Sequence, residues 1–169
     1  MELLRSLNTI VNSILSKVIT VGFMLMTVII FFQIIFRYAL HESLSWSEEL
    51  ARYFFIWVTF LGASVAFHER THINVDLFIN YIKNARVRAA LFLFGDLLSL
   101  SFLMMLVVEG TSVAIRVFKL DQVSASMDFL PIGLIYLAVP LGCLFMTLNI
   151  IMHAGSHVRE LLNPAEEGE

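Results

Sequence analysis

Charged side chains gather where two long apolar stretches of this sequence meet. Arg37 closes an uncharged run that begins at Val18, and Glu48, Glu49 and Arg52 precede the next apolar run. An ionisable side chain at membrane depth costs about 2.5 to 3.5 kcal/mol on insertion scales, so such groups usually pair, face protein or touch water. Glu48 and Arg52 have the i,i+4 spacing of a helical ion pair, worth about 0.2 to 0.5 kcal/mol in water. The sequence therefore predicts an ion-paired corner that braces the first two helices or holds a partner protein.

A second pattern with chemical meaning is His68-Glu69-Arg70-Thr71-His72, which matches the H-E-x-x-H signature of zinc proteases. On a helix the two histidines would share a face and bind Zn²⁺, and the glutamate would act as general base. The pattern falls where an apolar run ends, and no motif supplies a third ligand. A polar helix end explains it better, so a membrane zinc metalloprotease is kept as a remote alternative. Since no other metal, cofactor or nucleophile pattern is present, we expect neither an enzyme nor a cofactor.

The third candidate group is Asp96, which we interpret as the one acid well inside an apolar run, with Ser99 one turn later. Intramembrane carboxylates often mark ion or proton sites. No second carboxylate stands on a nearby turn, and a single carboxylate offers too few oxygen ligands for an ion cage. We therefore expect Asp96 to be a structural or partner-contacting group, and we keep an ion site as the alternative.

Membrane helices must position these groups. The chain is 59% hydrophobic and 15% charged, and its mean hydropathy is +0.83, values that soluble domains rarely show. Apolar stretches near residues 18–36, 53–67, 89–108 and 129–152 approach the roughly 20 residues that a span needs. The predicted fold is an all-α integral membrane protein, with a single four-helix transmembrane domain over residues 1–169.

Helix starts and packing positions are also readable. Ser45 followed by Glu48 forms a capping-box pattern, so the second helix is expected to begin near Ser45 or Ser47. Small residues four apart, starting at Gly62 and at Gly95, predict positions where helix backbones can approach closely.

Two prolines fall in the fourth apolar stretch. Pro140 lies midway along it and is expected to kink the span, whereas Pro131 falls in its first turn, where it is tolerated.

Two segments outside the spans have amphipathic patterns. Residues 1–17 predict an interfacial N-terminal helix, because apolar side chains recur there at helical spacing. A shorter segment, residues 75–82, predicts a similar helix between the second and third spans. Both are expected to lie against membrane lipid, and docking against the helices of a partner protein is the alternative.

Basic residues orient the four spans, because short cytoplasmic segments carry the excess of Lys and Arg. The side that holds both termini and the second loop carries Arg5, Lys17, Arg70, Lys83, Arg86, Arg88 and Arg159. The opposite side carries Arg37, Arg52, Arg116 and Lys119. This bias predicts that both termini, including the tail at residues 154–169, are cytoplasmic and that loops one and three face outward.

One combination of short motifs runs through the chain. It comprises Gln33, Arg37 and Tyr38, then Ser45-Trp46-Ser47-Glu48-Glu49 and Arg52, then Trp57, Phe60, Leu61, Gly62 and Ala63, then His72-Ile73-Asn74-Val75-Asp76, and finally Phe129-Leu130-Pro131 through Tyr136, Pro140 and Gly142. Together these motifs resemble the small membrane subunit, the DctQ-like component, of tripartite ATP-independent periplasmic (TRAP) transporters. The resemblance is strong over residues 30 to 80 and moderate over residues 126 to 145.

The resemblance implies a division of labour in the bacterial inner membrane. In that family a soluble periplasmic protein captures an organic acid, and a large membrane subunit carries it inward with sodium. The small subunit supports the static part of the large one. The implied partners are therefore the large membrane subunit, the periplasmic substrate-binding protein and membrane lipid, with no nucleic acid. The implied substrate is a dicarboxylate, sialic acid or a similar carboxylate. A self-sufficient oligomeric carrier or channel stays open as the alternative.

The residues proposed for these contacts fall into two sets. Candidates for the subunit or helix-helix interface are Gln33, Arg37, Tyr38, Trp46, Glu48, Glu49, Arg52, Trp57, Gly62, His72, Asp76 and Asp96. Candidates for contact with the binding protein are Asp121, Gln122, Ser124, Ser126 and Asp128. A solvated loop is the plainer interpretation of the second set.

Overall fold

The computed structural model describes residues 2–42, 44–68 and 85–162. Within these ranges the helices are α1 (Glu2–Ala39), α2 (Ser45–His68), α4 (Ala85–Lys119), α5 (Gly133–Tyr136) and α6 (Ala138–Leu162). Four apolar helical segments of the described chain are long enough to cross a membrane, and the fourth of them joins α5 to α6. The predicted all-α, four-span fold is confirmed.

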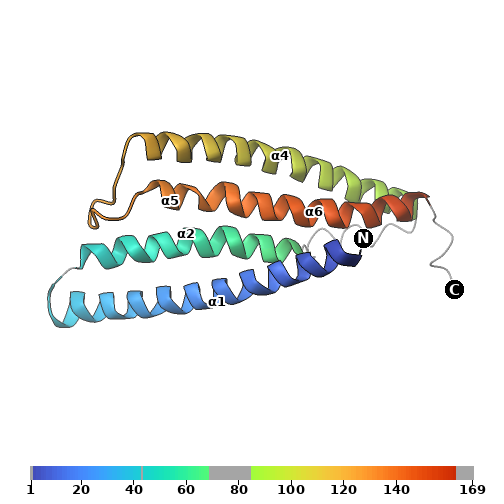
Figure 1. The fold of residues 1–169 in the computed structure, drawn as a ribbon. Helices are drawn as coiled ribbons and strands as arrows, with labels where there is room; N and C mark the ends of the chain where they lie inside the picture. Colours follow the sequence, from blue (N-terminus) through green and yellow to red (C-terminus); the bar gives the residue numbers. More distant parts are fainter. Residues whose placement is uncertain (1, 43, 69–84, 163–169) are drawn as a thin grey trace.

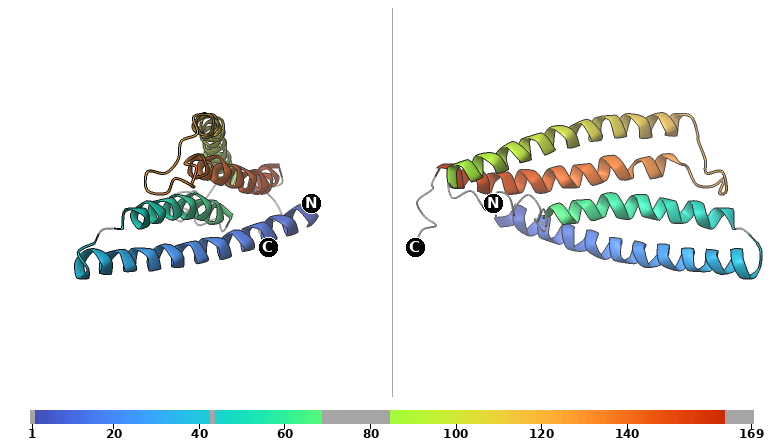
Figure 2. Two further views of the ribbon diagram at one scale, coloured as in Figure 1. Left: turned by 60° about the vertical axis from the view of Figure 1, so that its left-hand side comes forward. Right: turned by 180° about the vertical axis from the view of Figure 1, so that it is seen from behind.

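The four long helices lie side by side in one open layer, in the spatial order α1, α2, α6, α4 (Figures 1 and 2). Residues 40–42, which follow α1, and the loop 120–132 lie at one end of the layer, here called the loop end. The first turn of α1 and the last turn of α6 lie at the other, called the terminal end. Helix α1 lies along α2 and meets α6 only at the terminal end, and α4 lies along α6 and the short α5, so α1 and α4 are the edges of the layer.

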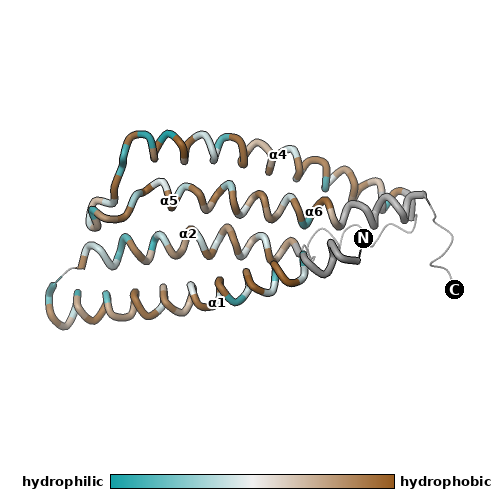
Figure 3. Tube along the Cα trace, viewed as in Figure 1, coloured by the Kyte–Doolittle hydropathy of each residue, from teal (hydrophilic) through white to brown (hydrophobic). Residues whose placement is uncertain are grey.

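Burial follows this order. In the apolar windows of α1 and α4 only 6% of residues are buried, against 17% in α2 and 44% in the α5 and α6 segment. The core lies around α6, where Leu103, Cys143, Met146 and Ile150 form a buried cluster. Hydrophobic residues continue along both edge helices (Figure 3). A layer of this kind leaves most of its apolar surface for lipid or for another protein.

Glycines set the spacing between the inner helices, but not those that the small-residue pattern singled out. A Cβ atom on Gly142 would lie 2.7 Å from the Phe60 Cβ and 2.9 Å from the Phe60 carbonyl oxygen, so α6 approaches the α2 backbone at this point. A Cβ at Gly62 or Gly95 would meet nothing within 4 Å. Neither glycine therefore lies at a close approach between the described helices, and a contact of either with another protein stays a prediction.

Pro140 breaks the fourth span near the loop end instead of kinking its middle. The ring removes the backbone donor that would bond the Tyr136 carbonyl four residues earlier. The short helix α5 ends at Tyr136, and α6 begins at Ala138. The apolar run from 129 to 152 suggested one helix with a central kink. Its first residues instead form part of the loop and α5, which places Pro140 in the first turn of α6.

The other predicted boundaries have mixed outcomes. Helix α2 begins at Ser45, as predicted. Residues 2–17 are helical but run without interruption into the first span, so α1 is one helix of 38 residues. That its first turns lie in the membrane interface stays a prediction. The amphipathic segment at 75–82 lies outside the described residues.

Candidate functional site

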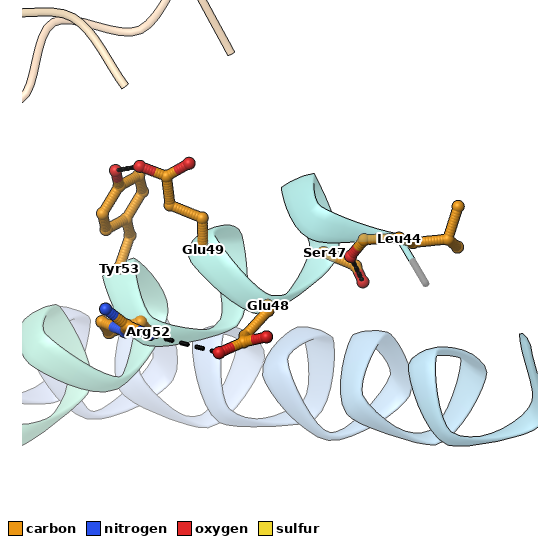
Figure 4. Close-up of polar contacts among 6 residues, drawn as sticks. All are labelled: Leu44, Ser47, Glu48, Glu49, Arg52 and Tyr53. Atoms are coloured by element: carbon orange, nitrogen blue, oxygen red, sulfur yellow. Dashed lines mark hydrogen bonds and ion pairs between the residues drawn. The ribbon is translucent and has the colours of Figure 1, made fainter. Parts of the chain in front are cut away.

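Glu49 connects α2 to the loop between α4 and α5. Its Oε2 atom accepts a hydrogen bond of 3.0 Å from the backbone N–H of Ser126, 77 residues further along the chain. Its Oε1 atom accepts a hydrogen bond from the Tyr53 hydroxyl, one turn along α2. Figure 4 shows Glu49 and Tyr53 extending together from one side of the helix. The carboxylate therefore fixes the loop end of α4 and α5 to the second span.

The loop that Glu49 holds is internally ordered. The Ser124 N–H donates to the Leu130 carbonyl and the Ile132 N–H donates to the Gln122 carbonyl, each at 2.9 Å. The buried Ser124 hydroxyl accepts a hydrogen bond of 3.2 Å from the Met127 N–H. These bonds close residues 122–132 into a compact loop with a defined conformation.

The residues predicted for binding-protein contact divide by exposure within this loop. Asp121, Gln122, Ser126 and Asp128 are exposed, whereas the side chain of Ser124 is buried. Asp121 has a φ of 46°, in the left-handed region that Asp tolerates better than most residues. Phe129, at the same loop, is 81% exposed. Ser124 thus supports the loop, and the other predicted residues are free to contact a partner.

The predicted ion-paired corner separates into different contacts. Arg52 pairs with Glu48 at 3.3 Å, and their side chains are 66% and 59% exposed. Exposed pairs of this kind contribute about 0 to 1 kcal/mol. Glu49 points toward the loop instead, and the Arg37 guanidinium lies 5.9 Å from the centre of the neighbouring Tyr38 ring. Figure 4 shows the Glu48 and Arg52 pair on a different side of α2 from Glu49.

The remaining predicted interface residues lie along α1, α2 and α4. Tyr38 and Trp46 are exposed near the loop end, where aromatic side chains commonly sit at membrane interfaces. Gln33, Trp57 and Asp96 are half-buried. His72 and Asp76 lie outside the described residues, as does the rest of the His68-to-His72 motif apart from the backbone of its first residue. In the part of the chain that the structure describes, no group of three or more His, Cys, Asp or Glu side chains is placed to hold a metal.

Sequence reasoning missed an asparagine cluster at the terminal end. The buried Asn149 of α6 accepts hydrogen bonds from Asn8 at 2.9 Å and from Asn12 at 3.2 Å, both on α1. It donates to the Asn12 side chain at 3.3 Å and to the Ser64 carbonyl on α2 at 3.0 Å. The cluster thus joins three helices. The signal for it was Asn149 itself, an amide inside an apolar run, which needs a polar partner in a membrane.

A second group was missed on α4. We ended the third apolar stretch at Val108, but the apolar helix continues to Lys119, so Glu109 also lies within this span. Asp96 is therefore not the only acid there. Glu109 is exposed in the described structure.

Comparison with known proteins assigns this chain to a family. Residues 26–160 match the family model described as "Tripartite ATP-independent periplasmic transporters, DctQ component". A TRAP transporter small permease protein of Haemophilus influenzae is 32% identical over 137 residues, which cover 80% of this chain and 82% of that protein. The sialic acid TRAP transporter small permease protein SiaQ of Vibrio cholerae is 29% identical, with 85% of this chain and 80% of that protein covered.

A longer relative is also similar. The isethionate TRAP transporter permease protein DctMQ of Oleidesulfovibrio alaskensis is 26% identical over 82% of this chain, yet the match covers only 22% of that protein. The family match, the relatives and the four spans agree on a multi-pass inner-membrane component of a transporter, and not an enzyme. This chain belongs to the DctQ family, the small permease components of tripartite ATP-independent periplasmic transporters.

Proposed function

We propose that this chain acts by binding a large membrane subunit and stiffening its static part, while that larger subunit carries the substrate. The observation that carries the proposal is the open layer. In the described part of the chain, a layer one helix thick encloses no interior through which a polar solute could cross. The buried side chains of Asn12, Ser47, Ser124 and Asn149 make helix and loop contacts instead. The Ser64 hydroxyl is the buried polar group without a hydrogen-bond partner among the described residues.

The longer relative supports the choice of partner. In DctMQ a segment similar to this chain makes up about a fifth of a single permease polypeptide. A short stretch of this chain is also 44% identical, over 48 residues, to the sialic acid TRAP transporter permease protein SiaT of Haemophilus influenzae, of which it covers 8%. If a separate large subunit takes the place of the remaining polypeptide, the two bare edges of the layer are its natural contact surfaces.

The substrate class is proposed as an organic acid, such as a dicarboxylate, sialic acid or a similar carboxylate. The names of the relatives cover isethionate, C4-dicarboxylate, sialic acid and ectoine. Because relatives of this one component serve such different solutes, we infer that other components of the transporter recognise the substrate. We propose sodium as the driving ion and the cytoplasm as the side of both termini.

The loop end is proposed to receive the periplasmic binding protein. The loop fixed by Glu49 presents Asp121, Asp128 and Phe129 to solvent. Charge reversal at Asp128 should raise the concentration of binding protein required for half-maximal uptake while leaving the assembled membrane complex intact. Glu42→Lys, an exposed charge reversal in the other loop, is the comparison that tells which loop is used. If neither variant changes that concentration dependence, the platform proposal is wrong.

Reconstitution tests the whole proposal. Liposomes would hold the large subunit of the same organism with or without this chain, and uptake of labelled organic acid would be measured with the binding protein outside. We expect uptake only with both membrane components and an inward sodium gradient. Uptake by this chain alone would support the self-sufficient carrier instead.

A further inference from the structure

Glu109 lies deep along the edge helix α4. It is ten residues before the helix ends at Lys119, about 15 Å at 1.5 Å per residue. A Cβ on its neighbour Gly110 would lie 3.2 Å from Pro140 of α6, and Gly142, two residues along α6, touches Phe60 of α2.

That chain of contacts gives the depth of Glu109 relative to α2. Phe60 lies eight residues beyond Arg52 along α2, about 12 Å further from the loop end. Gly142 is level with Phe60, and Pro140, two residues earlier on α6, is about 3 Å nearer the loop end. Glu109 is therefore about 9 Å further into the layer than the charged first turns of α2.

The carboxylate has no compensating group in the described structure. Glu109 is exposed, and neither a hydrogen bond nor an ion pair is found for it among the described residues. The positions one turn away on α4 are Met105, Leu106, Ser112 and Val113, none of which is basic. Arg116 follows only seven residues later, about 10 Å along the helix axis. A lone acid at this depth is costly against lipid, so such groups usually face protein.

The surface around Glu109 is open for a partner. Helix α4 is an edge of the layer, and its main contacts are with α6 and α5. Exposed apolar side chains, including Phe102 and Met105, lie on the terminal side of Glu109, and Ser112 and Arg116 lie on its loop side. A second helix aligned with α4 would therefore meet an apolar strip followed by an acid.

We propose that Glu109 is a docking residue whose carboxylate is received within the membrane by a cationic side chain of the large membrane subunit, along the open face of α4. This inference rests on the proposed function, since it names the surface through which that partner is bound. Charge complementarity selects a protein over lipid as the occupant. A second copy of this chain would place two lone acids, with no cation at their depth, against one another in a symmetric contact along this face.

Association with the large subunit of the same organism tests the proposal, with both proteins in lipid nanodiscs or mild detergent. Glu109→Leu should weaken association about 3- to 15-fold, the range of hydrogen bonds between membrane helices, and Glu109→Gln should lie between that variant and the wild type. Glu42→Gln removes an exposed acid from the loop between α1 and α2 and should bind like the wild type. Circular dichroism of each variant checks that the helices are retained.

A photo-crosslinking amino acid at Ser112 identifies the neighbour while leaving Glu109 intact. The same probe at Phe23 on α1 shows whether the other edge of the layer also contacts the large subunit. We expect the Ser112 probe to capture the large subunit near a Lys or Arg. Exchanging the charges, with Glu109→Lys here and Glu at that captured position, should restore at least half of the affinity that Glu109→Lys alone loses.

The outcomes separate this inference from the function on which it rests. If the wild-type chain does not bind the large subunit at all, the proposed function fails. If it binds while Glu109→Leu binds equally well, or if the Ser112 probe captures only lipid or a second copy of this chain, the docking role of Glu109 is wrong and the proposed function stands.

Discussion

The asparagine cluster at the terminal end gives the sharpest stability prediction. Asn149 has three interhelical partners: Asn8 and Asn12 on α1, and the Ser64 carbonyl on α2. Hydrogen bonds between membrane helices average about 0.6 kcal/mol and reach about 1.7 kcal/mol. Asn149→Leu should therefore lower the free energy of unfolding by about 2 kcal/mol, because the leucine keeps the volume and removes every polar contact.

A double-mutant cycle isolates the pair that joins α1 to α6. Asn12 and Asn149 share two contacts, at 3.2 and 3.3 Å, so their coupling should be about 1 kcal/mol. Unfolding would be followed in mixed micelles for both single variants and the double variant. Thr147→Val is the matched control, since the Thr147 hydroxyl bonds only the Cys143 carbonyl of its own helix. Additive effects of Asn12→Leu and Asn149→Leu, or a loss no larger than that of Thr147→Val, would refute the reasoning.

Three further predictions concern α2 and its neighbours. Glu49→Gln should speed hydrogen exchange of the loop amide that its carboxylate binds, whereas Glu48→Gln should not; equal exchange in both would contradict the brace. Gly142→Val should destabilise the layer by about 1 to 3 kcal/mol in thermal unfolding, because its Cβ meets the α2 backbone, while Gly62→Ala should be tolerated. Arg52→Ala should cost at most about 1 kcal/mol in the isolated chain yet reduce recovery of the complex without preventing membrane insertion, and unchanged recovery would remove Arg52 from the interface.

The sequence predicted the class of fold because hydropathy alone separates four spans from their connections. It also placed the start of α2 correctly at Ser45, where a capping signal follows a polar loop. It did not predict the open layer. Whether four apolar helices close into a bundle depends on which faces meet, and lipid-facing and protein-facing residues are equally apolar. For the same reason the pattern singled out Gly62, although the close approach occurs at Gly142.

The sequence identified several residues of the candidate site but did not predict which partners they contact. Glu48 and Glu49 are adjacent in sequence, but they stand about 100° apart around a helix. One therefore pairs along α2 and the other reaches a loop 77 residues away, a partner that local spacing cannot reveal. Glu109 was missed because an acid was taken to end an apolar run. The helix continues through it, and that continuity is what makes the residue informative.

The mass of the assembled complex tests the central claim most directly. This chain would be tagged, co-expressed with the large membrane subunit of the same organism, purified through the tag and measured by native mass spectrometry. We predict one copy of each protein in a complex that survives purification. A defined oligomer of this chain alone, active in moving solute across liposomes, would contradict the account.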